Sequence, residues 1–305
     1  MWWTLWPAPR VATVRETWET ADGDVLDLDF LPFRPGRPGV LVLHGLEGSS
    51  RASYIRRMLR GADALGWNGA GLNFRSCGPS TQRFPRSYHS GETGDLRLVV
   101  ERLLGRWGGV PLAVIGFSLG GNVVLKYLGE EGERAIVAAA VAVSTPYDLG
   151  AAAAALDSPG FFPWIYRTRF LRSLQRKTAR ALARFPGAVD AAKLAAVRSF
   201  TDFDDAVTAP LHGFRDARDY WARSSSSAFV PRIRVPTLLI SSEDDPIAPG
   251  TSIPRAAIAA NPVLTLVSTS RGGHVGFVEG FPFRPRFGAE REAFAFLRGL
   301  LGGAR

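Results

Sequence analysis

Short runs of consecutive apolar residues recur along the chain and predict strands that are buried on both faces. These runs lie at 40–43, 112–115, 135–143, 237–240 and 263–267. Strands of this kind are typical of parallel sheets that are covered by helices. Between and after them, apolar residues at helical spacing predict helices near 55–65, 96–104 and 290–301. The repeated alternation predicts an α/β fold with a doubly wound, mostly parallel central sheet flanked by helices.

Two regions depart from this alternation. Residues 25–30 alternate apolar and acidic side chains, and a turn at 21–24 separates them from a second candidate strand at 11–18, which predicts a leading antiparallel hairpin. Residues 147–230 contain no convincing buried strand and are rich in Ala, Arg and aromatic residues. A segment of this length between two core strands is more typical of a cap than of a loop.

This pattern divides the chain into two parts. We predict a core that is formed by residues 1–146 and 231–305, and a helical cap insertion that is formed by residues 147–230.

The composition excludes several classes of protein. The chain has 305 residues, of which 46% are hydrophobic and 21% are charged, so disorder and coiled coil are excluded for most of it. Its longest apolar run, 135–143, is far shorter than the roughly 20 residues that span a bilayer. The lone cysteine, Cys77, excludes an internal disulfide and a cysteine-based metal cluster. Because the start of the chain also lacks the pattern of a secretory signal, we expect a cytoplasmic protein.

The formal net charge is +9, and nearly all of the positive charge is arginine. A basic chain can bind nucleic acid, anionic lipid or an acidic substrate. No basic run is interleaved with aromatic residues in the way that is typical of nucleic-acid-binding modules. We therefore interpret the arginines as the coding bias of a GC-rich genome, and we expect no nucleic-acid partner.

The segment Gly116-Phe117-Ser118-Leu119-Gly120 matches the G-x-S-x-G pattern of a nucleophile elbow. In such an elbow a tight strand-to-helix turn exposes the serine Oγ, and the glycines keep other side chains out of the turn. The context fits, because an apolar strand is predicted before Ser118 and a helix after it. We interpret Ser118 as a catalytic nucleophile; the alternative is a glycine-rich helix start.

A serine nucleophile needs a histidine base, and two histidines follow Ser118 in the chain. His274 lies in a glycine-rich loop after the strand predicted at 263–267, where a loop can present an imidazole above a sheet. His212 lies inside the predicted cap and is the weaker candidate. We therefore predict His274 as the base.

The acid that orients the histidine is expected after the strand predicted at 237–240, where three acids stand in a row. We select Asp245, four residues before Pro249, and keep Asp244 as the alternative. The acid would accept a hydrogen bond from Nδ1 of the histidine and stabilise the imidazolium. A solvated acidic turn is the other interpretation of these residues.

The fourth requirement is an oxyanion hole made of backbone N–H groups. One donor is expected from Leu119, which follows the nucleophile, and the other from Leu46 in the loop His44-Gly45-Leu46-Glu47-Gly48. We interpret His44 as a structural residue that holds this loop.

Seven stretches of the chain resemble the YheT-like branch of the α/β-hydrolase superfamily, which comprises bacterial esterases with eukaryotic lipid-hydrolysing relatives. They lie at 44–59, 73–80, 86–96, 116–122, 200–214, 241–249 and 272–277. The resemblance extends from about residue 20 to residue 300. It implies an α/β-hydrolase fold, a triad of Ser118, Asp245 and His274, and hydrolysis of short- or medium-chain acyl esters without a metal or an organic cofactor.

The resemblance leaves some residues without a defined role. It marks the motif that contains His89, and we favour a role in holding the loop over a place at the entrance of the site. Family members usually carry more residues before the first hairpin, so Trp2, Trp3 and Trp6 are expected either to pack on the core or to be exposed.

The predicted cap has two notable features. Its aromatic residues are expected to line an acyl channel or to form the core of the cap; they are Phe161, Phe162, Trp164, Tyr166, Tyr220 and Trp221. Residues 167–184 contain six arginines and Lys177 without an acid. This pattern allows peripheral contact with an anionic membrane, although we favour a solvated helix.

Serine ester hydrolysis is thus the predicted function, and lipid esters are among the expected substrates. An acyltransferase or thioesterase would use the same triad. A carboxylate at the elbow would be needed for dehalogenase or epoxide hydrolase chemistry, so these are disfavoured. A non-catalytic binding protein is disfavoured because no triad residue is missing. The sequence leaves the oligomeric state open.

Overall fold

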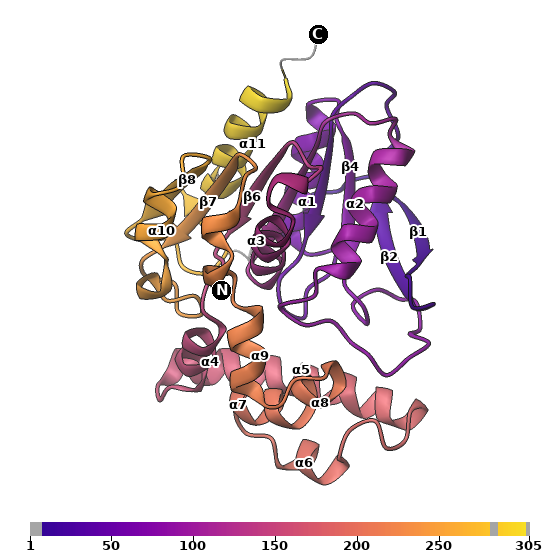
Figure 1. The fold of residues 1–305 in the computed structure, drawn as a ribbon, viewed down its shortest axis with the longest axis vertical. Helices are drawn as coiled ribbons and strands as arrows, with labels where there is room; N and C mark the ends of the chain where they lie inside the picture. Colours follow the sequence, from indigo (N-terminus) through magenta and orange to yellow (C-terminus); the bar gives the residue numbers. More distant parts are fainter. Residues whose placement is uncertain (1–7, 281–285, 303–305) are drawn as a thin grey trace.

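A computed structural model describes residues 8–280 and 286–302 of the chain. Trp2, Trp3 and Trp6 lie outside the described residues. Within the described part an eight-stranded sheet runs through the centre, in the order β1-β2-β4-β3-β5-β6-β7-β8 (Figure 1). Its strands are β1 (Val14–Glu19), β2 (Val25–Phe30), β3 (Gly39–Leu43), β4 (Asn68–Asn73), β5 (Leu112–Phe117), β6 (Ala139–Val143), β7 (Thr237–Ser242) and β8 (Leu264–Thr269).

The predicted mostly parallel sheet is confirmed. Strands β4, β3, β5, β6, β7 and β8 pair in parallel, whereas β1 and β2 form the predicted antiparallel hairpin. Helices cover both faces; they are α1 (Ser53–Ala64), α2 (Gly94–Arg106), α3 (Leu119–Glu131), α10 (Arg255–Ala259) and α11 (Gly288–Leu301). Leu41 and Leu43 of β3 are buried in a layer with α2 and α3, while Val40 and Val42 are buried in a layer with α1 and α11.

Three strand predictions need correction. Strand β4 was not predicted, because its sequence, Asn68-Gly69-Ala70-Gly71-Leu72-Asn73, is not an apolar run. Its glycines allow close packing, since a Cβ on Gly69 would lie 2.6 Å from Cδ1 of Leu31. The strand predicted at 135–143 begins only at Ala139. The segment at 263–267 is not buried on both faces, because β8 is an edge strand and none of its residues is fully buried.

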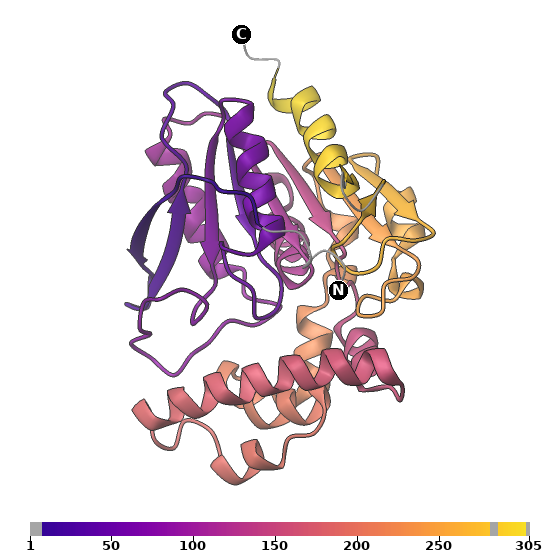
Figure 2. The ribbon, with the colours of Figure 1, turned by 180° about the vertical axis from the view of Figure 1, so that it is seen from behind.

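Between β6 and β7 the chain forms helices and no strand. They are α4 (Leu149–Asp157), α5 (Phe161–Arg184), α6 (Ala191–Ala196), α7 (Phe200–Phe203), α8 (Ala209–His212) and α9 (Ala217–Ser224), with a π-helical turn at Asp204–Thr208. In Figures 1 and 2 they lie together beyond the ends of the central strands. We call residues 148–226 the helical insertion, because its two ends meet where the Ser227 N–H donates to the Tyr147 carbonyl at 3.0 Å.

The side chain of Asn122 in α3 forms hydrogen bonds that help to hold the helical insertion on the rest of the chain. The Asn122 amide group donates to the carbonyls of Ser90 and Ser224, both at 2.8 Å, and its oxygen accepts from the N–H of Ser226. Asn122 is fully buried, so these bonds satisfy a side chain that has no access to water. No helix of the described residues is both long and apolar enough to cross a membrane.

Candidate active site

Ser118 lies at the junction of β5 and α3 with a φ of 52° and a ψ of −120°. This conformation is rare for a residue with a Cβ and persists only where the surrounding structure enforces it. The flanking glycines make the turn sterically possible. A Cβ on Gly116 would lie 2.3 Å from the Gly120 carbonyl oxygen, and one on Gly120 would lie 2.7 Å from the His44 carbonyl oxygen.

The structure brings Ser118, His274 and Asp245 into one chain of hydrogen bonds. Nε2 of His274 lies 2.8 Å from Oγ of Ser118, and Nδ1 lies 2.8 Å from Oδ2 of Asp245. A carboxylate can only accept, so Nδ1 carries the proton and Nε2 is free to accept from the serine hydroxyl. The Asp245 side chain is 1% exposed, and its carboxylate also accepts from the N–H groups of Ile247 and Ala248.

Asp244, the alternative acid, has a different role. Its Oδ1 accepts from the N–H groups of Gly272 and Gly273 at 2.9 and 2.8 Å, so it holds the loop that carries His274. Burial raises the pKa of Asp244, but the hydrogen bond from the Ser242 hydroxyl, together with those from Gly273 and Gly272, outweighs this effect and holds the pKa below its usual range. Two adjacent acids therefore hold the same histidine: Asp245 binds its ring, and Asp244 binds the backbone N–H groups of the two glycines before it.

A further support of His274 comes from Ser144, which the sequence analysis did not single out. Its Oγ accepts from the Val275 N–H at 3.2 Å. Ser144 has a φ of 51°, directly after β6. No local motif marks this residue, because its partner lies 131 positions away.

The backbone N–H groups of Leu46 and Leu119, the predicted oxyanion donors, are available to bind an oxyanion. In the loop after β3, the N–H of Gly45 donates to the Tyr54 hydroxyl, and the N–H of Glu47 donates to the Tyr88 hydroxyl. The amides of Leu46 and Leu119 donate to no group in the described part of the chain. Both residues line the same pocket as Ser118 and His274.

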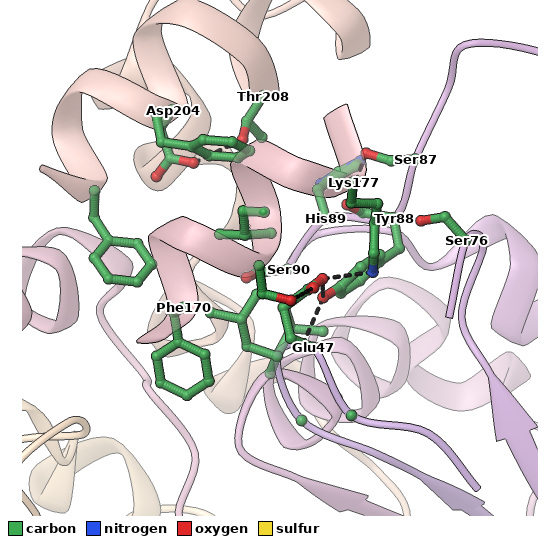
Figure 3. Close-up of a pocket in the computed structure, with 18 of the residues that line it drawn as sticks. Glu47, Ser76, Ser87, Tyr88, His89, Ser90, Phe170, Lys177, Asp204 and Thr208 are labelled. Carbon is green, nitrogen blue, oxygen red and sulfur yellow. Dashed lines mark hydrogen bonds and ion pairs between the residues drawn. The ribbon is translucent and has the colours of Figure 1, made fainter. Parts of the chain in front are cut away.

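Glu47, beside Leu46, is a residue whose role the sequence did not reveal. Its carboxylate accepts from the Tyr88 hydroxyl at 3.0 Å and from Ser173 at 2.5 Å, and it is ion-paired with Lys177 (Figure 3). Ser173 and Lys177 belong to α5, so one carboxylate joins the loop after β3 to the helical insertion.

The other three histidines take no part in the hydrogen bonds that join Ser118, His274 and Asp245. His44 is fully buried; its Nε2 accepts from the Phe74 N–H, and its Nδ1 donates to the Gly45 carbonyl. It therefore holds the loop as predicted. Burial lowers the pKa of His44 to about 4. His89 accepts the Gly91 N–H, which agrees with a role in holding its loop, and its largely buried side chain also lines the pocket. The ring centroids of His212 and His89 lie 4.4 Å apart. The histidine that contacts Ser118 is His274, not His212.

The pocket above Ser118 has a volume of about 620 Å³. The helical insertion supplies most of its apolar lining, including Leu149, Ala153, Leu156, Phe170, Leu174 and Phe203. Polar side chains line the pocket from two regions. The segment between β4 and α2 contributes Ser76, Ser87, Tyr88, His89 and Ser90 (Figure 3), and the helical insertion contributes Arg169, Ser173, Arg176, Lys177, Asp204 and Thr208. Among the described residues, no group of three His, Cys, Asp or Glu side chains is placed to hold a metal ion.

The aromatic residues of the predicted cap divide into two sets. Tyr166, Tyr220 and Trp221 line the pocket, as one of the two expectations had it. Phe161, Phe162 and Trp164 neither line it nor form a core, because they are 68%, 67% and 53% exposed. The expectation of burial is therefore wrong for these three residues of the first turn of α5.

The fold and the elbow define an α/β hydrolase, and the chain belongs to that family: the model of the alpha/beta hydrolase fold matches residues 38–281. Within it, the resemblance to the YheT-like branch is confirmed. The Escherichia coli K12 protein named "Putative esterase YheT" is 37% identical over 89% of this chain and 81% of its own length.

Less similar relatives are also named as enzymes that act on esters or share the fold. Mouse phospholipase ABHD3 is 30% identical over 89% of this chain and 68% of its own length. The solved Pyrococcus furiosus esterase Pf2001 has a TM-score of 0.63 with 18% identity, over 97% of this chain and all of its own, and so shows the same fold. The names of these relatives agree with the predicted enzyme class, carboxylic ester hydrolase.

Proposed function

We propose that this protein is a serine hydrolase of carboxylic esters, with Ser118 as nucleophile, His274 as general base and acid, and Asp245 as the residue that orients His274. The observation that carries the proposal is the unbroken hydrogen-bond chain from Asp245 through His274 to Ser118 at the wall of the pocket. The relatives named as an esterase and a phospholipase support the same reaction class.

The reaction proceeds in two acyl-transfer steps. Nε2 of His274 takes the hydroxyl proton as Oγ of Ser118 attacks the ester carbonyl carbon, and the backbone N–H groups of Leu46 and Leu119 stabilise the oxyanion. The protonated His274 then gives its proton to the departing alcohol. Water, deprotonated by the same histidine, hydrolyses the acyl-enzyme and releases the carboxylic acid.

The substrates are esters with a short- to medium-chain acyl group, or lipids. The pocket volume of about 620 Å³ and the apolar residues of α4, α5 and α7 suit an acyl chain rather than a polar substrate. The acyl chain lies along these apolar side chains, while the polar residues between β4 and α2 face the alcohol portion of the ester.

The test is hydrolysis of a p-nitrophenyl ester series from acetyl to palmitoyl. Wild type is expected to show a maximum at one chain length, and Ser118→Ala to lose turnover across the series. Ser270→Ala, which alters an exposed serine outside the pocket lining, is the matched control and keeps activity. Wild-type activity in Ser118→Ala would overturn the mechanism, and ester formation with an added alcohol in place of hydrolysis would assign the acyltransferase alternative.

A further inference from the structure

The first turn of α5 exposes a compact aromatic cluster. Phe161, Phe162 and Trp164 are each more than half exposed, and they contact one another: the rings of Phe161 and Phe162 lie 5.7 Å apart and those of Phe161 and Trp164 6.3 Å apart. Single exposed apolar side chains are common on protein surfaces, but a contiguous aromatic cluster indicates a surface that binds something.

Arginines continue this surface along the same helix. Arg169, Arg172, Arg176 and Arg180 are exposed and separated by three or four residues, so they share one face of α5. Phe162 lies seven residues before Arg169, two turns earlier on that face. None of the four arginines forms an ion pair within the described part of the chain, and the sequence has no acid between Asp157 and Asp190.

The position of α5 makes this surface accessible. The helix runs along one side of the insertion, at the front in Figure 2, and α6 rather than α5 lies farthest from the sheet (Figures 1 and 2). It also forms part of the pocket wall through Tyr166, Phe170 and Leu174, and the exposed side chains of Arg169 and Arg176 reach the pocket as well. The same helix therefore carries an exposed aromatic and cationic surface that borders the pocket.

We propose that the surface formed by Phe161, Phe162, Trp164, Arg169, Arg172, Arg176 and Arg180 docks the protein on an anionic phospholipid bilayer. Aromatic side chains insert at the level of the headgroups, while arginines on the same face bind the anionic phosphates and carboxylates of the surface. The arginine spacing alone equally suits a solvated helix; the exposed aromatic cluster is what distinguishes the two. Docking needs no catalysis, whereas delivery of a lipid ester to the pocket rests on the proposed function.

The test is co-sedimentation of the full chain with vesicles of phosphatidylcholine alone and of phosphatidylcholine mixed with phosphatidylserine. We expect binding to the mixed vesicles that weakens with salt. Replacing all four arginines by Gln is expected to weaken it roughly 100-fold or more. The control makes the same charge change at four exposed arginines outside the insertion, Arg60, Arg134, Arg232 and Arg298, and retains most of the binding.

A second pair of variants tests the aromatic cluster. Replacing Phe161, Phe162 and Trp164 by Ser should abolish binding at physiological salt, whereas Phe33→Ser, at another exposed phenylalanine, should not. Ser118→Ala is expected to bind vesicles as wild type does, which separates docking from catalysis. Circular dichroism and thermal melting check that every variant is folded.

Three results would overturn the proposal. They are failure of the wild type to bind mixed vesicles, equal binding by the α5 arginine variant and its control, and preferential retention on duplex DNA at the same salt concentration. The last result would assign the arginines to nucleic acid.

Discussion

Nζ of Lys177 lies 2.5 Å from a carboxylate oxygen of Glu47, across the junction between the helical insertion and the loop after β3. Glu47 precedes Gly48 and follows Leu46, whose N–H is a proposed oxyanion donor, and it holds a φ of 53°. The ion pair therefore stabilises a loop conformation that the backbone alone disfavours. Because Lys177 belongs to α5 and Glu47 adjoins Leu46, this ion pair also couples the position of α5 to the geometry of the proposed oxyanion hole.

The first prediction concerns this pair. Lys177→Met leaves the carboxylate of Glu47, whose side chain is 8% exposed, without its cation and should destabilise the fold by about 1–3 kcal/mol. It should also lower kcat more than it raises KM, because the loop shifts. Adding Glu47→Gln removes the buried charge, so the double variant should recover part of the stability. Urea unfolding measures this; a double variant as unstable as the sum of the two single variants would contradict the coupling.

The second prediction separates the two adjacent acids. Asp245→Asn should lower kcat about 10³- to 10⁴-fold, because Nδ1 of His274 loses the acceptor that fixes its tautomer. Asp244→Asn is the matched control: it weakens the loop around Gly272 and should change kcat by no more than about tenfold. Steady-state kinetics on one ester measures both. A larger loss in Asp244→Asn than in Asp245→Asn would exchange their roles.

The third prediction concerns Asp204, which lines the pocket and accepts from Thr208 and Trp221. Burial raises its pKa from 3.8 to about 6. A folded state that binds the proton more tightly than the unfolded state loses stability as pH rises through the interval between the two pKa values. The contribution of Asp204 is therefore complete below about pH 4 and lost by about pH 6.

Asp204→Asn removes this titration. Relative to the variant, wild type should lose up to about 3 kcal/mol of unfolding free energy between pH 4 and pH 6.5. Chemical denaturation at a series of pH values measures the difference between the two proteins. A constant difference across this range would show that Asp204 does not titrate there.

The fourth prediction tests the elbow through two glycines. Gly116→Ala places a Cβ 2.3 Å from a backbone oxygen that cannot move away, so we expect a loss of about 3 kcal/mol or more together with loss of activity. Gly105→Ala, in α2, meets no atom within 4 Å and should stabilise the protein by about 0.4–1 kcal/mol. Thermal unfolding of both variants, with ester hydrolysis, is the measurement.

Sequence reasoning found the parts of the site that local patterns encode. The elbow at Ser118 has obligatory glycines, and the chain order of acid and histidine directed the search to Asp245 and His274. It did not find Ser144 or the pairing of Glu47 with Lys177, because these contacts join residues 130 or more positions apart. No local periodicity records such a contact.

The fold shows the same division. Parallel strands with apolar runs were predictable, whereas β4 was not, because close packing there selects glycine and asparagine rather than Val or Ile. The exposure of Phe161, Phe162 and Trp164 was also unpredictable. Aromatic residues in a helix are normally predicted to be buried, and only the packing of α5 shows that these three are exposed.

The hydrogen bond between Tyr147 and Ser227 has a further consequence. A segment whose two ends meet at one point can be grafted as a unit, because the strands below need not change register when it is exchanged. Residues 148–226 of this chain are thus a natural unit for transplanting acyl preference between relatives. Such a chimera needs to keep a cation opposite Glu47 and the backbone partners of Asn122, since these contacts join the graft to the recipient.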